Sequence, residues 1–110
     1  MSRLDTRLVL MSEVADERVL RIKRLQDNLS VVRKIAGWTT EQLGNKIGIS
    51  KQTISNLENN KNPLTFARYI ATRTILDYEI ETSTTNGVLP KAVTILLDSA
   101  DKEFDTLKKF

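Results

Sequence analysis

Apolar residues follow a helical period through the first 36 positions of the chain. They are separated by alternating steps of four and three residues, as on one stripe of an amphipathic helix. Arg18 interrupts the stripe, and Gly37 follows it, where a glycine commonly ends a helix. The stripe contains Leu4, Leu8, Met11, Ala15, Ile22, Leu25, Leu29, Val32 and Ala36. We predict a long helix over about residues 16–36, with residues 3–13 as either a shorter helix or an arm.

Glycine, asparagine and proline divide the rest of the chain into shorter helical segments. Helices are predicted over residues 39–47, 50–59 and 65–80. The first ends at Gly48, the second ends at the polar stretch 59–63, and residues 82–87 have the composition of a linker. A last helix begins at Pro90 and carries apolar residues on one face, namely Val93, Leu96, Leu97, Ala100, Phe104 and Leu107. Because no strand-like alternation is sustained, we expect an all-α fold.

Residues 39–58 contain the caps and small residues that a tight turn between two short helices requires. Thr39 and Gln42 can form a capping box on the first helix, and Ser50 can cap the second. Gly48 can adopt a positive φ between them, and Gly44 lies where crossing helices need a small residue. The inward positions are Leu43, Ile47, Ile54 and Leu57. Ordinary core packing seldom requires all of these features at these spacings, so we predict a helix-turn-helix.

The outward face of the second short helix is polar and nearly free of acidic residues. It presents Lys51, Gln52, Ser55, Asn56 and Asn59. Glu58 is the one acidic residue between Lys46 and Lys61. Amides of Gln and Asn can bond to adenine N6 and N7, and a Lys ammonium can reach guanine O6 or N7. Such a face can simply be solvated, but beside the predicted turn it favours contact with a DNA groove.

The charge of the chain is distributed unevenly. Residues 1–76 hold 13 Lys and Arg against 7 Asp and Glu, whereas residues 77–110 hold 4 against 7. The local balances are therefore +6 and −3, which add to the net charge of +3. A phosphate backbone would be attracted to the part of the chain that contains the predicted turn.

Four pieces of the sequence match a known pattern at fixed offsets. They are Leu29-x-x-x-Arg33, Trp-Thr-Thr-Glu-Gln-Leu over residues 38–43, Gly-Ile-Ser over 48–50, and Ile-Ser-Asn-Leu-Glu-Asn over 54–59. With these pieces, residues 29–80 resemble the Cro and phage-repressor (Xre-like) helix-turn-helix family. The resemblance implies a five-helix repressor-like DNA-binding domain whose third helix enters the major groove, usually as a homodimer on a pseudo-palindromic operator.

The resemblance also implies roles for individual residues. The base-reading positions are Lys51, Gln52 and Asn56, with Ser55 as a fourth. The positions that contact the DNA backbone are Thr40, Asn45, Ser50, Thr53 and Asn59, with Lys61 beyond the helix. A partly buried ion pair between Arg33 and Glu58 is implied as well, and it would make Glu58 structural.

The chain departs from the family pattern at three places, one of them inside a matched piece and two just beyond one. Thr40 stands where relatives often have Gln, so its phosphate contact would be shorter. Gly44 replaces the usual Ala, which is expected to weaken the helix by about 1 kcal/mol. Asn60 stands where Gly is usual, and Asn tolerates the left-handed conformation.

We therefore divide the chain into three parts. Residues 1–28 form an N-terminal helical extension, residues 29–80 form the DNA-binding domain, and residues 81–110 form a linker plus an added C-terminal helix. That last helix either packs on the domain or pairs with its copy in a dimer. The N-terminal extension can supply a further contact between subunits, and we expect a homodimer built by these flanks.

Several kinds of chemistry are excluded by residue content. The chain has no His and no Cys, so the usual nucleophile pairs, disulfides and zinc sites are not expected. Its four glycines are scattered, which disfavours a phosphate-binding loop. The apolar runs are too short for a membrane span, and the charged N-terminus is unlike a signal peptide. We expect a cytoplasmic protein with no enzymatic activity, cofactor, metal or membrane partner.

Taken together, these features predict a sequence-specific DNA-binding transcription regulator. We expect a repressor that binds double-stranded DNA as a homodimer and uses the helix over residues 50–59 in the major groove. The alternative is an antitoxin-like or adaptor module that uses the same scaffold to bind another protein. The sequence leaves a protein partner or effector ligand unidentified.

Overall fold

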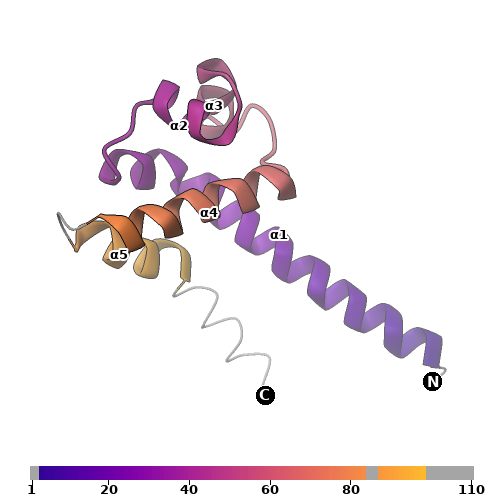
Figure 1. The fold of residues 1–110 in the computed structure, drawn as a ribbon. Helices are drawn as coiled ribbons and strands as arrows, with labels where there is room; N and C mark the ends of the chain where they lie inside the picture. The colour runs from indigo at the N-terminus through magenta and orange to yellow at the C-terminus, as the bar shows by residue number, and fades with distance from the viewer. Residues whose placement is uncertain (1–2, 84–86, 99–110) are drawn as a thin grey trace.

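The computed structural model describes residues 3–83 and 87–98, with side chains from Glu17 onward within these ranges. The regular elements of this part are all helical (Figure 1), as expected from the sequence. They are α1 (Arg3–Ile35), α2 (Thr40–Ile47), α3 (Lys51–Glu58), α4 (Phe66–Thr82), α5 (Val88–Val93) and the π-helical turn η1 (Thr94–Asp98). Among the described helices, none is both long and apolar enough to cross a membrane.

The first helix is continuous from the extension into the domain. α1 has 33 residues and includes residues 3–13, for which the sequence left a helix or an arm open, together with the long helix predicted from about residue 16. Its N-terminal part projects away from the other helices, whereas its C-terminal part lies against them (Figure 1). The helix ends at Ile35, two residues before Gly37, whose φ is +83°. The Gly37 and Trp38 N–H groups bond back to the carbonyls of Lys34 and Arg33, respectively, and so close the end of the helix.

The two short helices begin and end at the predicted residues. The Thr39 hydroxyl accepts from the Gln42 N–H, and the Gln42 side chain accepts from the Thr39 N–H, so the capping box is present. Ser50 caps α3 by accepting from the Thr53 N–H. Gly48 has a φ of +77° after α2, and Asn60 has a φ of 57° after α3. The left-handed turns predicted at these two positions are therefore present.

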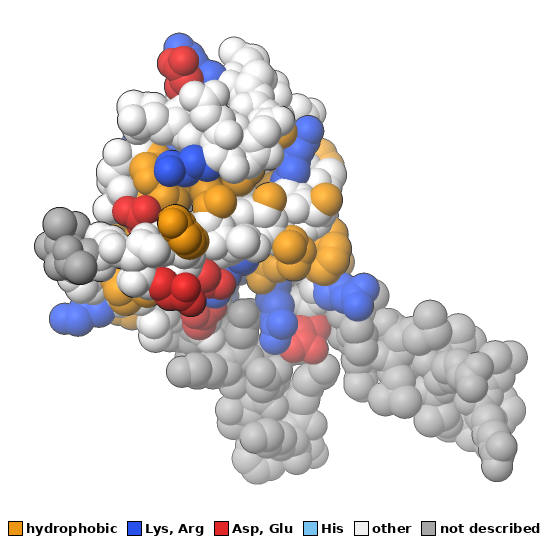
Figure 2. All heavy atoms as spheres, viewed as in Figure 1, with side chains coloured by type: hydrophobic (Ala, Val, Ile, Leu, Met, Phe, Trp, Pro, Cys, Tyr) orange, Lys and Arg blue, Asp and Glu red, His pale blue; other side chains and the backbone are white. Residues whose placement is uncertain are grey.

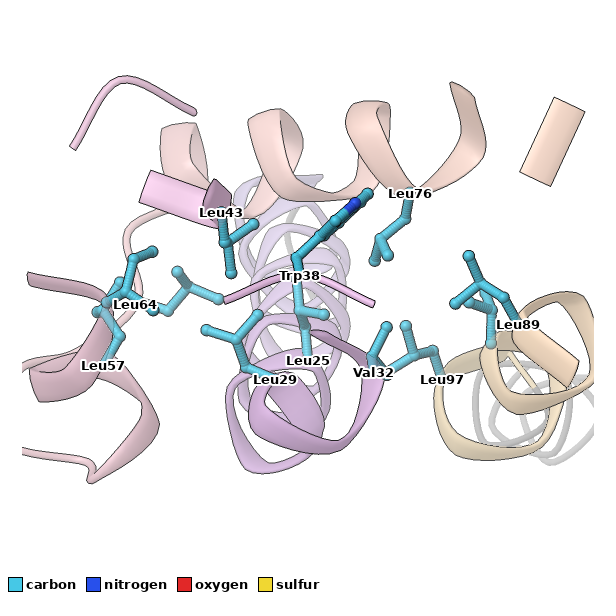
Figure 3. Close-up of a cluster of buried hydrophobic side chains, with 12 residues drawn as sticks. Leu25, Leu29, Val32, Trp38, Leu43, Leu57, Leu64, Leu76, Leu89 and Leu97 are labelled. Carbon is cyan, nitrogen blue, oxygen red and sulfur yellow. The ribbon is translucent and has the colours of Figure 1, made fainter. Parts of the chain in front are cut away.

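One hydrophobic core joins α1 to all the later helices. Figure 3 shows Leu25, Leu29 and Val32 of α1 pointing toward Trp38 and toward Leu76 of α4. Trp38 is buried at the centre of this cluster. The other members include Leu43, Leu57 and Leu64 on one side and Leu89, Val93 and Leu97 on the other. α3 therefore packs directly on α1, and α2 packs on α3 and α4.

The C-terminal element returns to the domain. Leu89, Val93 and Leu97 of α5 and η1 are buried in the same core, and α5 and η1 both contact α1. Arg73 of α4 forms an ion pair with Asp98 at the end of η1, with Nη1 3.1 Å from Oδ1. Of the two arrangements that the sequence allowed for the last helix, residues 88–98 therefore adopt the one in which it packs on the domain. The apolar positions Ala100, Phe104 and Leu107 lie outside the described residues.

Candidate nucleic-acid interface

The turn between α2 and α3 is tight enough to require glycine at position 44. The Ile49 N–H bonds to the Gly44 carbonyl at 2.9 Å, which brings the turn back onto α2. A Cβ atom on Gly44 would overlap the Ile49 carbonyl oxygen and lie 3.3 Å from the Ser50 carbonyl carbon. The absence of a side chain at this position therefore lets the start of α3 approach α2 closely.

α3 has a buried face and an opposite polar face. Ile54 and Leu57 are 0% exposed, so they fix which side of the helix points outward. Lys51 and Gln52 are exposed, and Ser55 and Asn56 are partly exposed. Gln52 Nε2 donates to Asn56 Oδ1 at 3.1 Å, which aligns the two amides one turn apart. The structure thus brings together the four residues that the sequence proposed for contact with bases.

The residues proposed for contact with the DNA backbone lie around α3 and on α2. Ser50 is the N-cap of α3, Asn59 is its C-cap, and Lys61 is exposed in the turn that follows. Thr53 is in the first turn of α3, where its hydroxyl lies 2.8 Å from the Ser50 hydroxyl. Thr40 and Asn45 are separate from this group, because they occupy the first turn and the middle of α2. This is a polar rim with donors at both ends of α3.

The acidic residue of α3 is held away from the outward face. Glu58 accepts two hydrogen bonds from Arg33, at 2.7 Å from Nε and 3.1 Å from Nη2. Their side chains are only 9% and 10% exposed, and Arg33 Nη1 also donates to the Trp38 carbonyl at 2.8 Å. The ion pair therefore connects the end of α3 to α1 and neutralises a carboxylate that would otherwise repel phosphate.

Gln26 is a residue of the site that the sequence analysis did not identify. Its buried amide donates to the carbonyls of Leu57 and Asn62 at 3.0 and 2.8 Å, and its oxygen accepts from the Leu64 N–H at 3.1 Å. These bonds connect α1 to the end of α3 and to the loop that follows it. The available signal was a polar residue between Leu25 and Leu29, on the apolar side of α1.

α3 is held in place by its caps, by its buried face, and by the Arg33–Glu58 ion pair and the Gln26 hydrogen bonds that connect it to α1. Its outward face is polar and poor in acidic residues. This arrangement defines a helix-turn-helix DNA-binding domain. A family model described as helix-turn-helix matches residues 20–81, which is more than half of the chain. The chain therefore belongs to the Cro and phage-repressor (Xre-like) helix-turn-helix family, and the resemblance found in residues 29–80 is confirmed. The family consists of DNA-binding domains and not of enzymes, which agrees with the expected lack of enzymatic activity.

Two curated proteins are similar to the chain over part of its length. Antitoxin HipB of Escherichia coli (strain K12) is 36% identical over 53 residues, which cover 48% of this chain and 60% of the relative. Antitoxin HipB of Escherichia coli O6:H1 is 41% identical over 44 residues, which cover 40% of this chain and 47% of the relative. The chain thus spans less than two thirds of the length of either relative. No solved structure matches the chain significantly.

Proposed function

We propose that the protein is a sequence-specific transcription regulator that binds operator DNA through α3 and represses by blocking a promoter. The observation that carries this proposal is the outward face of α3, which offers ammonium and amide groups while Glu58 is paired with Arg33. A helix surface that served only as a solvated face would have no need to exclude carboxylates. The proposal places the protein where the DNA is, in the cytoplasm.

In this proposal the polar face of α3 makes the base contacts. Gln52 and Asn56 contact adenine, Lys51 contacts guanine, and Ser55 adds a hydroxyl that can donate or accept. The Gln52–Asn56 hydrogen bond uses one donor and one acceptor, so the remaining amide groups are presented in a fixed order. Thr40, Asn45, Ser50, Thr53, Asn59 and Lys61 position the helix by contacts with phosphates.

We further propose that two copies bind together on a two-fold operator. The flanks of the proposed DNA-binding domain supply the contacts between subunits, residues 1–28 through the outer side of α1, and residues 81–110 through positions other than the buried Leu89, Val93 and Leu97. In support, Val19 and Leu20 on α1 are 62% and 50% exposed, so this helix carries apolar side chains that a second subunit can cover. Light scattering at tens of micromolar is expected to give the mass of a dimer, and the mass of a monomer contradicts this part of the proposal.

Selection of bound duplexes from a random DNA pool tests the proposal as a whole. We expect an enriched sequence with two half-sites related by a two-fold axis and separated by about one helical turn, or 10 base pairs. Because the same experiment reports sequence preference, symmetry and spacing, it separates a specific dimer from a general DNA binder. A pool that shows no enrichment after repeated rounds contradicts specific binding.

An antitoxin-like or adaptor protein that binds another protein is a second candidate. The names of the two relatives favour it, although each alignment covers only part of the relative. The two candidates differ in their DNA behaviour, because a specific DNA complex weakens steeply with salt. Salt-independent or undetectable DNA binding would favour the second candidate.

A further inference from the structure

A hollow between α1 and the first turns of α4 lies outside the DNA-binding face. It has a volume of about 300 Å³ and is lined by Arg18, Arg21, Phe66, Tyr69, Ile70 and Arg73. None of these residues belongs to the set proposed for contact with DNA. Among the described residues, the lining combines three guanidinium groups with two aromatic rings and one branched side chain, and it contains no carboxylate.

The apolar half of the hollow is open to solvent. Phe66 and Ile70 are 50% and 46% exposed, and Figure 2 shows hydrophobic side chains gathered near the start of α4 with basic side chains beside them. The rings of Phe66 and Tyr69 are stacked with centroids 6.3 Å apart. The Arg18 guanidinium carbon lies 5.6 Å from the centre of the Phe66 ring, so a cation is positioned against the aromatic surface.

Among the described residues around the hollow, two of the three arginines have carboxylate partners. Arg21 Nη2 contacts Glu17 at 2.8 Å, and Arg73 contacts Asp98 at 3.1 Å and Asp77 at 3.8 Å. These three carboxylates offset the positive charge of Arg21 and Arg73, whereas Arg18 forms no ion pair with a described carboxylate. An apolar ligand that carries a carboxylate can therefore pair with Arg18 at the aromatic side of the hollow.

We propose that this hollow binds a segment of another protein in which Asp or Glu is adjacent to Phe, Leu or Ile. The apolar side chain of that segment covers Phe66 and Ile70, and its carboxylate pairs with Arg18. The apolar side of the hollow, Phe66 and Ile70, is about half exposed, which suits a side chain from a protein surface better than a small molecule that must be enclosed on most sides. The protein then has two separate binding surfaces, α3 for DNA and the α1–α4 hollow for a protein.

The full chain can be tested with dodecapeptides displayed on phage, followed by anisotropy measurements with the enriched peptides in labelled form. We expect enriched peptides to contain an acidic residue next to an aromatic or branched one. Arg18→Gln and Phe66→Ser are each expected to weaken binding by about tenfold or more, as typical for Arg and aromatic anchors. The matched controls are Arg24→Gln, an exposed arginine of α1, and Tyr78→Ser, an aromatic residue of α4 that is 66% exposed. Both controls should leave peptide binding unchanged.

DNA binding of the same variants separates this inference from the proposed function. Phe66→Ser, which lies outside both flanks proposed for contacts between subunits, is expected to bind the selected operator as the unmodified chain does. Enriched peptides without the acidic and apolar pair, or equal effects of test and control variants, overturn the inference. It is also overturned if Arg18→Gln reduces DNA affinity instead of peptide affinity, or if Phe66→Ser abolishes self-association, because the hollow then serves DNA or a second copy.

Discussion

At position 44, two effects of an added methyl group oppose each other. Alanine is favoured over glycine in a helix by about 1 kcal/mol, but its Cβ would overlap the backbone oxygen of Ile49, which cannot rotate away like a side chain. We expect the overlap to dominate, so Gly44→Ala should lower the free energy of unfolding by about 1–3 kcal/mol. Urea unfolding measures this change. Asn45→Ala, at an exposed position of the same helix, serves as the control, and a gain in stability for Gly44→Ala contradicts the tight-turn geometry.

The buried ion pair predicts a large effect of Glu58. Glu58→Ala leaves Arg33 without its carboxylate in a site where both side chains are at most 10% exposed, so unfolding should become easier by about 3–5 kcal/mol. Thermal unfolding followed by circular dichroism measures the loss. Glu81→Ala, at an exposed position near the end of α4, should change stability little. Equal stability of the two variants shows that the pair contributes no more than a surface contact.

Replacing the amide of Gln26 with an apolar side chain of similar size is expected to reduce stability. Gln26→Leu preserves volume approximately but leaves the buried Leu64 N–H without this partner, at a cost of about 1–3 kcal/mol, and also removes the part-buried bond to the Asn62 carbonyl. Hydrogen exchange of the loop after α3 should become faster in this variant. Arg24→Leu, two residues earlier and exposed, is the control. If the Leu64 amide exchanges at the same rate in Gln26→Leu and in the unmodified chain, the Gln26 hydrogen bonds do not hold this loop on α1.

At the scale of elements, the sequence predicted what local chemistry determines. The capping box at Thr39, the cap at Ser50 and the left-handed residues Gly48 and Asn60 follow from side chains and backbone within a few residues. The long-range contacts could not be predicted in the same way. Gln26 bonds to groups 31 to 38 residues away, and its amide gives no sign of them until α1 and α3 are packed together.

Two further features depend on the same long-range packing. The sequence did not decide whether α1 is continuous, because Arg18 interrupts an apolar stripe without breaking a helix. The hollow beside α4 also could not be predicted, because its lining comes from two segments about 50 residues apart in the chain. The polar face of α3 was predictable, because it needs only one helix and one buried side.

For the whole molecule, the single core predicts that α5 and η1 stabilise the distant DNA-binding helices. Leu97 is 3% exposed in this core, so Leu97→Ala should reduce the free energy of unfolding by about 2–5 kcal/mol. The loss should appear equally in circular dichroism and in the fluorescence of Trp38, the one tryptophan of the chain. Ile95→Ala, at a position 66% exposed, is the control. If the unfolding transition followed by Trp38 fluorescence is the same in Leu97→Ala and in the unmodified chain, α5 and η1 unfold separately from the rest of the domain.

Salt-dependent binding of the selected operator shows whether the polar face of α3 recognises bases. We compare the unmodified chain with a variant in which Lys51, Gln52 and Asn56 are all alanine, using the operator and an unrelated duplex. We expect the variant to stay folded, to bind both duplexes equally weakly, and to have a salt slope smaller by about one, because the positive charge of Lys51 at the DNA is lost. If the variant still prefers the operator as strongly as the unmodified chain does, α3 does not read the bases.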